Sequence, residues 1–146
     1  MKLFFAGSFN PFTKGHKSIA DRALQLCDGG IVIGVGYNID KPGSRAESQK
    51  RADAIKALYA DDSRVEAIAY QGLTYEAARQ HGCDALLRGV RSVADFEYER
   101  NIADVNRRIC GIETLLMFTT PEEACISSGM VRELEAFGAD VSQFLP

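Results

Sequence analysis

The sequence predicts a single α/β domain built on a doubly wound, five-stranded parallel sheet. Short apolar runs rich in β-branched residues alternate along the chain with longer segments of helical periodicity. No linker, low-complexity tract or internal repeat interrupts this alternation, and 146 residues are enough for one sizeable core. Parallel strands need crossover connections, and alternating strands and helices supply them. We therefore expect residues 1–146 to form one domain.

The first half of the chain predicts three strands and two helices. Residues 30–36 (GIVIGVG) are a continuous apolar run, which is typical of a strand buried on both faces. The two helices have apolar residues at helical spacing, namely Ile19, Ala23, Leu26 and Cys27 in the first and Ala54, Ile55, Leu58 and Tyr59 in the second. In chain order we expect a strand at 2–7, a helix at 16–27, a strand at 30–36, a helix at 44–60 and a strand at 64–70.

The second half continues the pattern and is marked by end signals of helices. Gly82 stands at the C-cap position of a short helix. Ser127 or Ser128 is a natural N-cap for the last helix, with Glu133 downstream. The expected elements are a helix at 74–82, a strand at 84–90, a helix at 93–109, a strand at 113–118 and a helix at 127–138.

Composition and charge exclude several classes of function. A net charge of −3 and a pI near 5.4 argue against broad binding to nucleic acid or to an anionic membrane. Met1 and Lys2 lead directly into a short apolar run, which predicts neither a secretory leader nor a membrane span, and so a cytoplasmic location. The four cysteines form no CxxC pair, so we expect reduced thiols and no metal site at Cys27, Cys83, Cys110 and Cys125.

Unusual residues gather where the predicted strands end. In doubly wound sheets, ligands bind at this carboxyl edge. The sequence contains no Walker lysine motif, and the glycines of residues 30–36 lie inside a strand rather than in a dinucleotide-binding turn. The candidate ligand-binding segments are the strand exits, at residues 7–9, 36–41, 72–74, 88–91 and 119–129.

Residues 7–16 (GSFNPFTKGH) are the most informative of these segments. Gly7 and Ser8 allow close approach of the backbone to a ligand, and Pro11 fixes the turn. Gly15 and His16 stand at the head of a helix, whose free N–H groups favour a phosphate. Spacing alone leaves open whether His16 donates a hydrogen bond to that phosphate or is a turn residue without a role.

Two arginines favour the phosphate interpretation. Arg88 and Arg91 follow the fourth strand, and each offers several donors for phosphate oxygens. Glu99, in the following helix, could meet a ribose or a backbone group. No Ser-His-Asp order and no HExxH motif stands out, which gives little support to hydrolysis by a nucleophile or a metal.

Three segments resemble known motifs in the order and spacing of one family. Residues 7–16 resemble the [ST]-F-[DN]-P-x-[TH]-x-G-H signature of the nucleotidylyltransferase superfamily. Residues 86–99 (LLRGVRSVADFEYE) look like the hallmark segment of bacterial phosphopantetheine adenylyltransferases, and residues 126–133 (ISSGMVRE) are similar to their ISSSxVRE segment. Gly129 replaces the third serine of that segment. The resemblance implies a Rossmann-like nucleotidylyltransferase fold.

The resemblance also implies an activity and a set of site residues. Such enzymes transfer an adenylyl group from ATP to 4′-phosphopantetheine with Mg²⁺, giving dephospho-coenzyme A and pyrophosphate, and assemble as homohexamers. By motif position, His16 would stabilise the transition state, assisted by Lys41 and Arg91. Ser8, Lys41, Thr74 and Arg88 would bind phosphopantetheine. ATP would contact Ser8, Phe9, His16, Gly89, Val90, Arg91, Glu99, Glu123, Ala124, Cys125, Ile126, Ser127, Ser128 and Gly129.

Two other functions remain open at this stage. One is nucleotidyl transfer to a different phosphorylated acceptor, because the first and last motifs are shared across the superfamily. The other is a non-catalytic domain that binds ATP without turning it over. A histidine beside two phosphate-facing arginines counts against the second, because simple binding does not require a transition-state donor.

Overall fold

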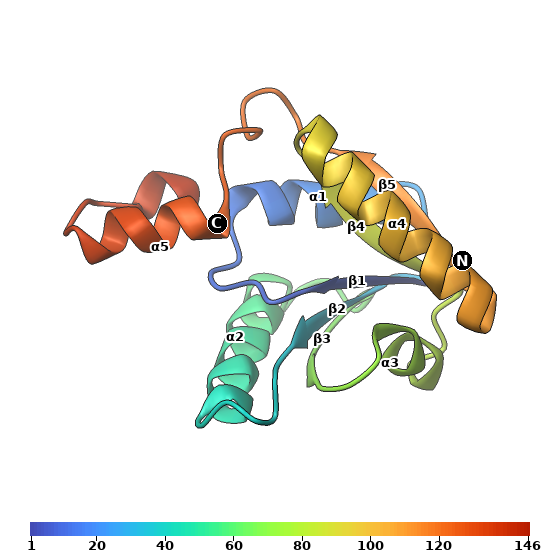
Figure 1. The fold of residues 1–146 in the computed structure, drawn as a ribbon. Coiled ribbons are helices and arrows are strands. Elements are labelled where there is room, and N and C mark those ends of the chain that lie inside the picture. Colours follow the sequence, from blue (N-terminus) through green and yellow to red (C-terminus); the bar gives the residue numbers. More distant parts are fainter.

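Five parallel strands form one sheet in the computed structural model, which describes residues 1–146 (Figure 1). In chain order the elements are β1 (Leu3–Gly7), α1 (Lys14–Leu24), β2 (Ile31–Gly36), α2 (Ser44–Leu58), β3 (Val65–Tyr70), α3 (Thr74–Gln80), β4 (Ala85–Val90), α4 (Val93–Cys110), β5 (Glu113–Phe118), α5 (Ser128–Ala136) and a 3₁₀ turn (Ser142–Phe144). The strand order is β3-β2-β1-β4-β5, and all neighbours pair in parallel. The predicted α/β class and doubly wound sheet are confirmed.

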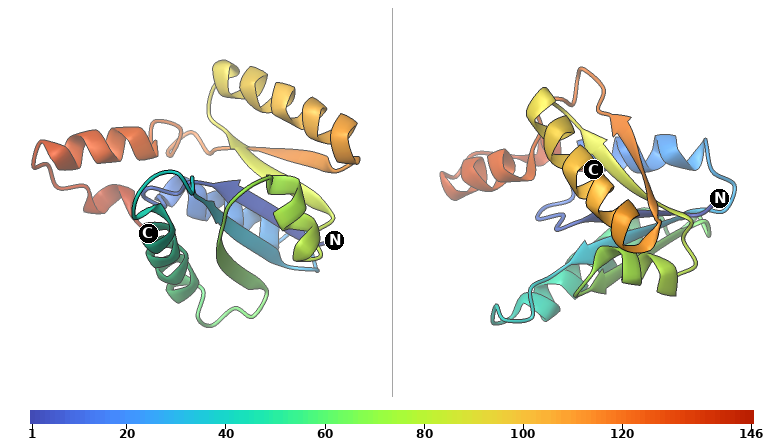
Figure 2. Two further views of the ribbon diagram at one scale, coloured as in Figure 1. Left: turned by 60° about the horizontal axis from the view of Figure 1, so that its bottom comes forward. Right: turned by 45° about the vertical axis from the view of Figure 1, so that its right-hand side comes forward.

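The helices bury the two faces of the sheet in two separate cores. Successive residues of a strand point to opposite faces, so Leu3 and Phe5 of β1 pack with α1 and α2, whereas Phe4 packs with α3. β1 lies at the centre of the sheet, and its residues Leu3 to Ala6 are all buried. Figure 2 shows the strongly twisted sheet between these helices. This arrangement fixes the carboxyl ends of β1 and β4 relative to one another.

Three residues predicted on apolar helix faces are exposed instead. Leu26 is 74% exposed because α1 ends at Leu24 and Leu26 lies in the turn that follows. Ala54 and Leu58 point to solvent because α2 packs on the sheet through another face. That face is made mostly of small residues at helical spacing, Ser44, Ser48, Ala52 and Ile55.

The C-terminal part of the chain has a small core of its own. α5 and the segment after it pack around Ile126, Val131 and Val141, apart from the two sheet cores. In Figures 1 and 2, α5 lies to one side of the sheet. Two hydrogen bonds join it to the loop after β1: the Ser128 hydroxyl donates to the Pro11 carbonyl at 2.8 Å, and Arg132 Nη1 donates to the Asn10 carbonyl at 2.6 Å.

Predictions from the sequence also concern the cysteines and membrane-spanning helices. The four cysteines are free thiols, with Cys27 and Cys83 buried and Cys125 exposed. No helix of the structure combines the length and the apolar character that crossing a bilayer requires.

Candidate active site

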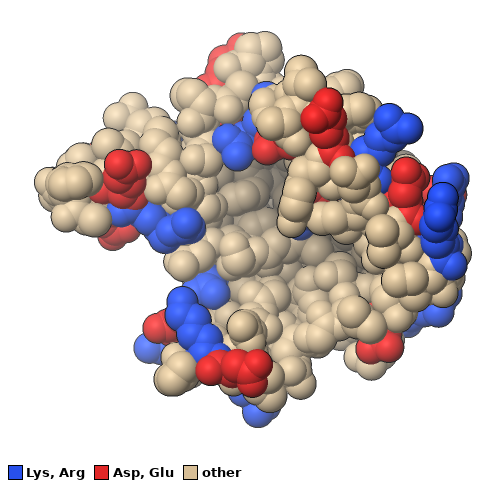
Figure 3. All heavy atoms as spheres, in the orientation of Figure 1, with Lys and Arg blue, Asp and Glu red and all other residues tan.

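A pocket of roughly 400 Å³ opens at the carboxyl edge of the sheet, between β1 and β4. These strands are neighbours, but the chain leaves them toward α1 on one face and α4 on the other, so their exits diverge. The walls are the loop after β1, the first turn of α1, the end of β4, the first turns of α4 and the beginning of α5. Figure 3 shows the molecule hollowed on this side, with basic side chains around the hollow.

The loop after β1 is shaped by a buried phenylalanine. Phe9 has a φ of 45°, in the left-handed region, and its side chain is buried against Phe5 and Phe12. A Cβ on Gly7 would come within 3.0 Å of the Phe9 ring, so the fold of this loop favours glycine there. The loop backbone can therefore approach a ligand while its large side chains, Phe9 and Phe12, face inward.

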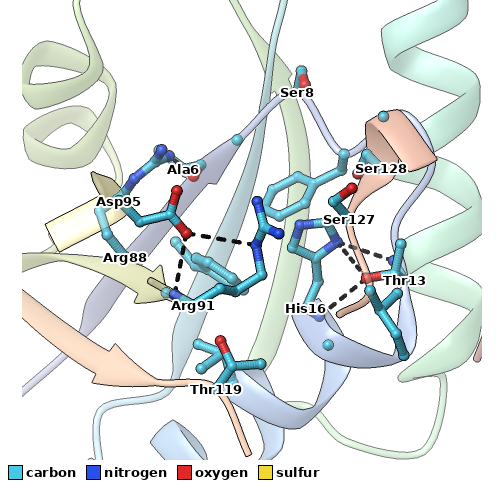
Figure 4. Close-up of a pocket in the computed structure, with 18 of the residues that line it drawn as sticks. Ala6, Ser8, Thr13, His16, Arg88, Arg91, Asp95, Thr119, Ser127 and Ser128 are labelled. Atoms are coloured by element: carbon cyan, nitrogen blue, oxygen red, sulfur yellow. Dashed lines mark hydrogen bonds and ion pairs between the residues drawn. The ribbon is translucent and has the colours of Figure 1, made fainter. Parts of the chain in front are cut away.

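His16 is held in a single orientation at the head of α1. Thr13 caps the helix, its hydroxyl accepting from the His16 backbone N–H at 3.4 Å, and the His16 side chain completes the capping box. In that box, His16 Nδ1 accepts a hydrogen bond from the Thr13 backbone N–H at 3.0 Å. Because Nδ1 is the acceptor, the proton of the neutral ring must sit on Nε2. His16 thus carries one N–H donor that Thr13 does not use (Figure 4).

Aromatic rings and two cations keep His16 neutral. The imidazole stacks on Phe12 at a centroid distance of 5.5 Å and meets the edge of Phe9 at 5.0 Å. Burial, followed by the positive charges of Arg88 and Arg91, lowers the pKa of His16 from 6.5 to about 4. At neutral pH the side chain is therefore an uncharged hydrogen-bond donor in a positive environment.

Arg88 is fixed by contacts on two sides. Its Nε and Nη2 donate to the two carboxylate oxygens of Glu99, at 2.9 and 2.7 Å, and Nη1 donates to the Ala6 carbonyl of β1. Burial works to lower the pKa of Arg88, but the hydrogen bonds and charge of Glu99 outweigh it and hold that pKa above its ordinary value. Arg88 is therefore charged and oriented before any ligand binds.

Arg91 is held more loosely than Arg88. Its backbone N–H donates to Asp95 Oδ2 at 3.1 Å, and its Nε lies 3.6 Å from the same oxygen. Both side chains are at least one third exposed, so this pair adds little to stability. Figure 4 shows Arg91 extending between Asp95 and His16, where its guanidinium can reach an anion in the pocket.

The structure brings most of the predicted site residues together. Those that line the pocket are Ser8, Phe9, His16, Arg88, Gly89, Arg91, Glu99, Ile126, Ser127, Ser128 and Gly129. Six others do not line it, namely Lys41, Thr74, Val90, Glu123, Ala124 and Cys125. The roles of all of them remain predictions.

The predicted site residues that do not line the pocket lie in several different elements. Lys41 lies in the exposed loop after β2, and Val90 is buried in the sheet. Thr74 begins α3, and its hydroxyl is 2.9 Å from the Tyr70 hydroxyl. Glu123 lies in the turns between β5 and α5, where its carboxylate accepts a hydrogen bond from the Thr120 hydroxyl. A ligand larger than the pocket would have to extend from it to meet Lys41 or Thr74.

Several lining residues were given no role from the sequence, among them the polar residues Thr13, Asp95 and Arg132. Thr13 stands three residues before His16, which is the spacing of a capping box. Asp95 follows Arg91 by four residues, a spacing that brings two side chains together on a helical turn. Arg132 follows Ser128 by one helical turn. Each spacing was a usable signal.

The pocket offers no ready cage for a metal ion. No group of three or more histidine, cysteine, aspartate or glutamate side chains comes together anywhere in the structure. The two carboxylates of the pocket, Asp95 and Glu99, are already paired with arginines. Mg²⁺ is often held by only one or two carboxylates together with substrate phosphates. The protein donors alone therefore do not fit a resident metal.

The pocket combines an oriented neutral donor, two arginines and a helix N-terminus, and it presents no activated nucleophile. Such a site suits reactions in which a phosphorylated substrate supplies its own nucleophile. Residues 4–134 match the family described as cytidylyltransferase-like, so fold and site define a nucleotidylyltransferase.

Relatives of known name narrow the family further. Over 145 residues, the chain is 46% identical to the phosphopantetheine adenylyltransferase of Bacteroides thetaiotaomicron and 49% identical to that of Phocaeicola vulgatus, in each case covering 99% of this chain and 95% of the relative. The enzyme of the same name from Leuconostoc citreum is 41% identical over 143 residues, covering 97% and 89%. The chain belongs to the phosphopantetheine adenylyltransferase family.

Solved structures of low sequence identity share the fold. A Vibrio parahaemolyticus protein assigned as a nicotinate-nucleotide adenylyltransferase superposes with a TM-score of 0.67 at 16% identity, covering 99% of this chain and 85% of its own. A protein of unknown function from Archaeoglobus fulgidus superposes with a TM-score of 0.57 at 19% identity, covering 87% of this chain and 95% of its own. The predicted Rossmann-like nucleotidylyltransferase fold is confirmed.

Proposed function

We propose that this protein transfers the adenylyl group of ATP to 4′-phosphopantetheine, giving dephospho-coenzyme A and pyrophosphate. The relatives that carry the name of this activity match nearly the whole chain. The structural observation that carries the proposal is the neutral His16 donor beside Arg88 and Arg91 at the head of α1. Phosphoryl chemistry with a ready-made nucleophile needs such donors and needs no general base.

In this reaction an oxygen of the acceptor phosphate forms a bond to the α-phosphorus of ATP. The bond from that phosphorus to the bridging oxygen breaks, and pyrophosphate leaves with the electron pair. The acceptor phosphate is already largely ionised at neutral pH, because its second pKa is about 6. The protein therefore contributes orientation and charge stabilisation. We assign to His16 Nε2–H a hydrogen bond that stabilises the negative charge developing on the α-phosphoryl oxygens.

The remaining pocket residues divide between the two substrates. Arg88, at the inner end of the pocket, would hold the phosphate of the acceptor. Lys41 and Thr74 would meet that substrate where it extends beyond the pocket. Arg91, Gly89 and the residues from 123 to 129 would hold the nucleotide, with phosphates near the N-termini of α1 and α5.

Mg²⁺ remains part of the proposal as a companion of ATP. The carboxylates of the pocket are paired with arginines, so the ion would arrive bound to the triphosphate and would be held mainly by phosphate oxygens and water. When bound there it would neutralise charge on the departing pyrophosphate. Asp95, with the more exposed of the two carboxylates, would be the nearest protein group to assist.

We propose that the protein assembles as a homohexamer in the cytoplasm. α4 has several exposed apolar side chains, and β5 at the sheet edge has two more: Val93, Phe96, Ile102, Val105, Ile109, Leu115 and Phe118. Exposed apolar side chains in this number favour contact with another subunit. Light scattering at micromolar concentration tests the assembly. A monomeric mass would contradict it.

One assay distinguishes the proposed reaction from its alternatives. The protein is incubated with ATP, Mg²⁺ and a panel of phosphorylated acceptors, and pyrophosphate is measured. We expect release only with 4′-phosphopantetheine. Equal turnover with nicotinamide mononucleotide would indicate a different acceptor class. ATP binding without turnover on any acceptor would indicate a non-catalytic nucleotide-binding domain.

A further inference from the structure

Glu99 is the one buried residue of α4, and it is charged. Its side chain is 7% exposed, whereas the apolar residues of the same helix lie largely in solvent. Burying a carboxylate is costly unless it is paired and hydrogen-bonded. Here both oxygens accept hydrogen bonds from one guanidinium, that of Arg88, in a bidentate (two-pronged) contact. Glu99 therefore has no carboxylate oxygen without a partner in the protein.

This contact determines which part of Arg88 faces a ligand. A guanidinium has five N–H donors. Glu99 takes two of them, through Nε and Nη2, and the Ala6 carbonyl takes a third, through Nη1. The planar guanidinium is thus fixed between α4 and β1. The directions of its two remaining N–H donors are therefore fixed as well. A flexible arginine side chain would lose conformational freedom each time it bound a phosphate, and this loss would weaken binding.

The neighbouring pair provides a comparison within the same pocket. Asp95 stands four residues before Glu99 on α4, and it pairs with Arg91. That pair is at least one third exposed and contacts the arginine side chain through one nitrogen at 3.6 Å. The buried, two-pronged contact of Glu99 is the one that can fix a guanidinium.

We propose that Glu99 is a positioning residue for the acceptor, which holds Arg88 in the orientation that binds the phosphate of the acceptor substrate. This inference rests on the proposed function, because it requires that Arg88 binds the acceptor. It gives Glu99 a role toward the acceptor, in addition to the nucleotide contact that the family resemblance implies.

The first test is Glu99→Gln, with Glu97→Gln as its control. Glutamine has one acceptor oxygen and turns an NH₂ group toward the donors of Arg88, so the two-pronged contact is lost while the shape is retained. We expect kcat/KM for 4′-phosphopantetheine to fall roughly 10-fold or more, and by a larger factor than the ATP affinity measured by calorimetry. Glu97 is exposed on the same helix, and its variant should match the wild type. Weaker ATP binding with acceptor kinetics unchanged would overturn the proposal.

A double-mutant cycle tests whether Glu99 acts through Arg88. In Arg88→Lys, which cannot form a two-pronged contact, Glu99→Gln should have little further effect on the KM for 4′-phosphopantetheine. Equal effects in both backgrounds would overturn the proposal. Glu99→Asp, which keeps the charge, should recover part of the loss in the wild-type background, and a variant no better than Gln would count against orientation by the carboxylate.

Stability gives a readout that does not depend on activity. Arg88→Ala leaves the Glu99 carboxylate buried without its partner, so adding Glu99→Gln should raise Tm above that of Arg88→Ala alone. A further decrease in Tm would overturn the pairing on which the inference rests. If the wild type shows no turnover with 4′-phosphopantetheine, the proposed function itself has failed. If the wild type is active and the cycle shows no coupling, only the role of Glu99 is wrong.

Discussion

The buried imidazole of His16 predicts a specific loss of stability on mild acidification. In the unfolded chain a histidine has a pKa near 6.5, whereas burial and the charges of Arg88 and Arg91 lower that of His16 to about 4 in the folded protein. Between these values the unfolded state binds more protons, so the free energy of unfolding decreases as the pH falls from about 6.5 to about 4. At pH 5 the unfolded histidine is nearly fully charged while the folded one is mostly neutral, which corresponds to about 2 kcal/mol.

The measurement compares urea unfolding at pH 7 and pH 5 for the wild type and for His16→Gln. Glutamine does not ionise and is a usual partner in a capping box, so it can accept from the Thr13 N–H as His16 Nδ1 does. All other ionisable groups are shared, and their contributions cancel in the difference. We expect the wild type to lose about 2 kcal/mol more than His16→Gln between the two pH values. Equal losses would show that His16 is solvated, and the explanation of its neutral state would be wrong.

Three further variants test the assignment of the pocket. His16→Ala should lower kcat by roughly 10²–10³-fold while changing the Kd for ATP little, because the lost donor acts mainly on transition-state charge. Single-turnover rates and calorimetry measure the two effects, and a large loss of ATP affinity with a near-normal rate would make His16 a binding residue only. Arg88→Ala removes charge-assisted hydrogen bonds worth roughly 1.5–3 kcal/mol and should weaken phosphopantetheine more than ATP. The reverse order in calorimetry would reassign Arg88 to the nucleotide. Gly129→Ser should fold normally, since a Cβ there would meet only the Arg132 guanidinium at 3.8 Å. Its hydroxyl should tighten ATP binding by a few-fold, about 0.5–1.5 kcal/mol, and unchanged affinity would show that the missing serine does not reach the phosphates.

Secondary structure and topology were largely predictable because the signals are local. The apolar run of residues 30–36 forms β2, buried on both faces of the sheet, and Gly82 ends α3 with a positive φ. The predicted apolar face of α2 was right for Ile55 and Tyr59, which are buried, and wrong for Ala54 and Leu58, for a physical reason. Close packing against a sheet favours small side chains, so Ser44 and Ser48 are buried where hydrophobicity alone would choose Ala54 and Leu58.

The chemistry of the pocket was predictable as residue types but not as partnerships. His16 and Arg88 could be selected because they stand at strand exits and helix heads. That Glu99 meets Arg88 across 11 residues depends on how α4 rotates as it packs beside β4, and no sequence spacing determines that rotation. The neutral state of His16 likewise depends on Phe9 and Phe12 closing around its ring, which requires the three-dimensional path of the loop.

The separate core of α5 implies that the protein can open without unfolding. Regions with few contacts to the main core open independently and at lower free energy than the whole domain. α5 is joined to the loop after β1 by the hydrogen bonds of Ser128 and Arg132, and its apolar residues pack mainly on one another. Detaching it would disassemble one wall of the pocket while the sheet remains intact. A nucleotide that touches both α1 and α5 would close this unit, so occupancy of the site would be reported by slower exchange of amide hydrogens in α5, far from the strands that hold the domain together.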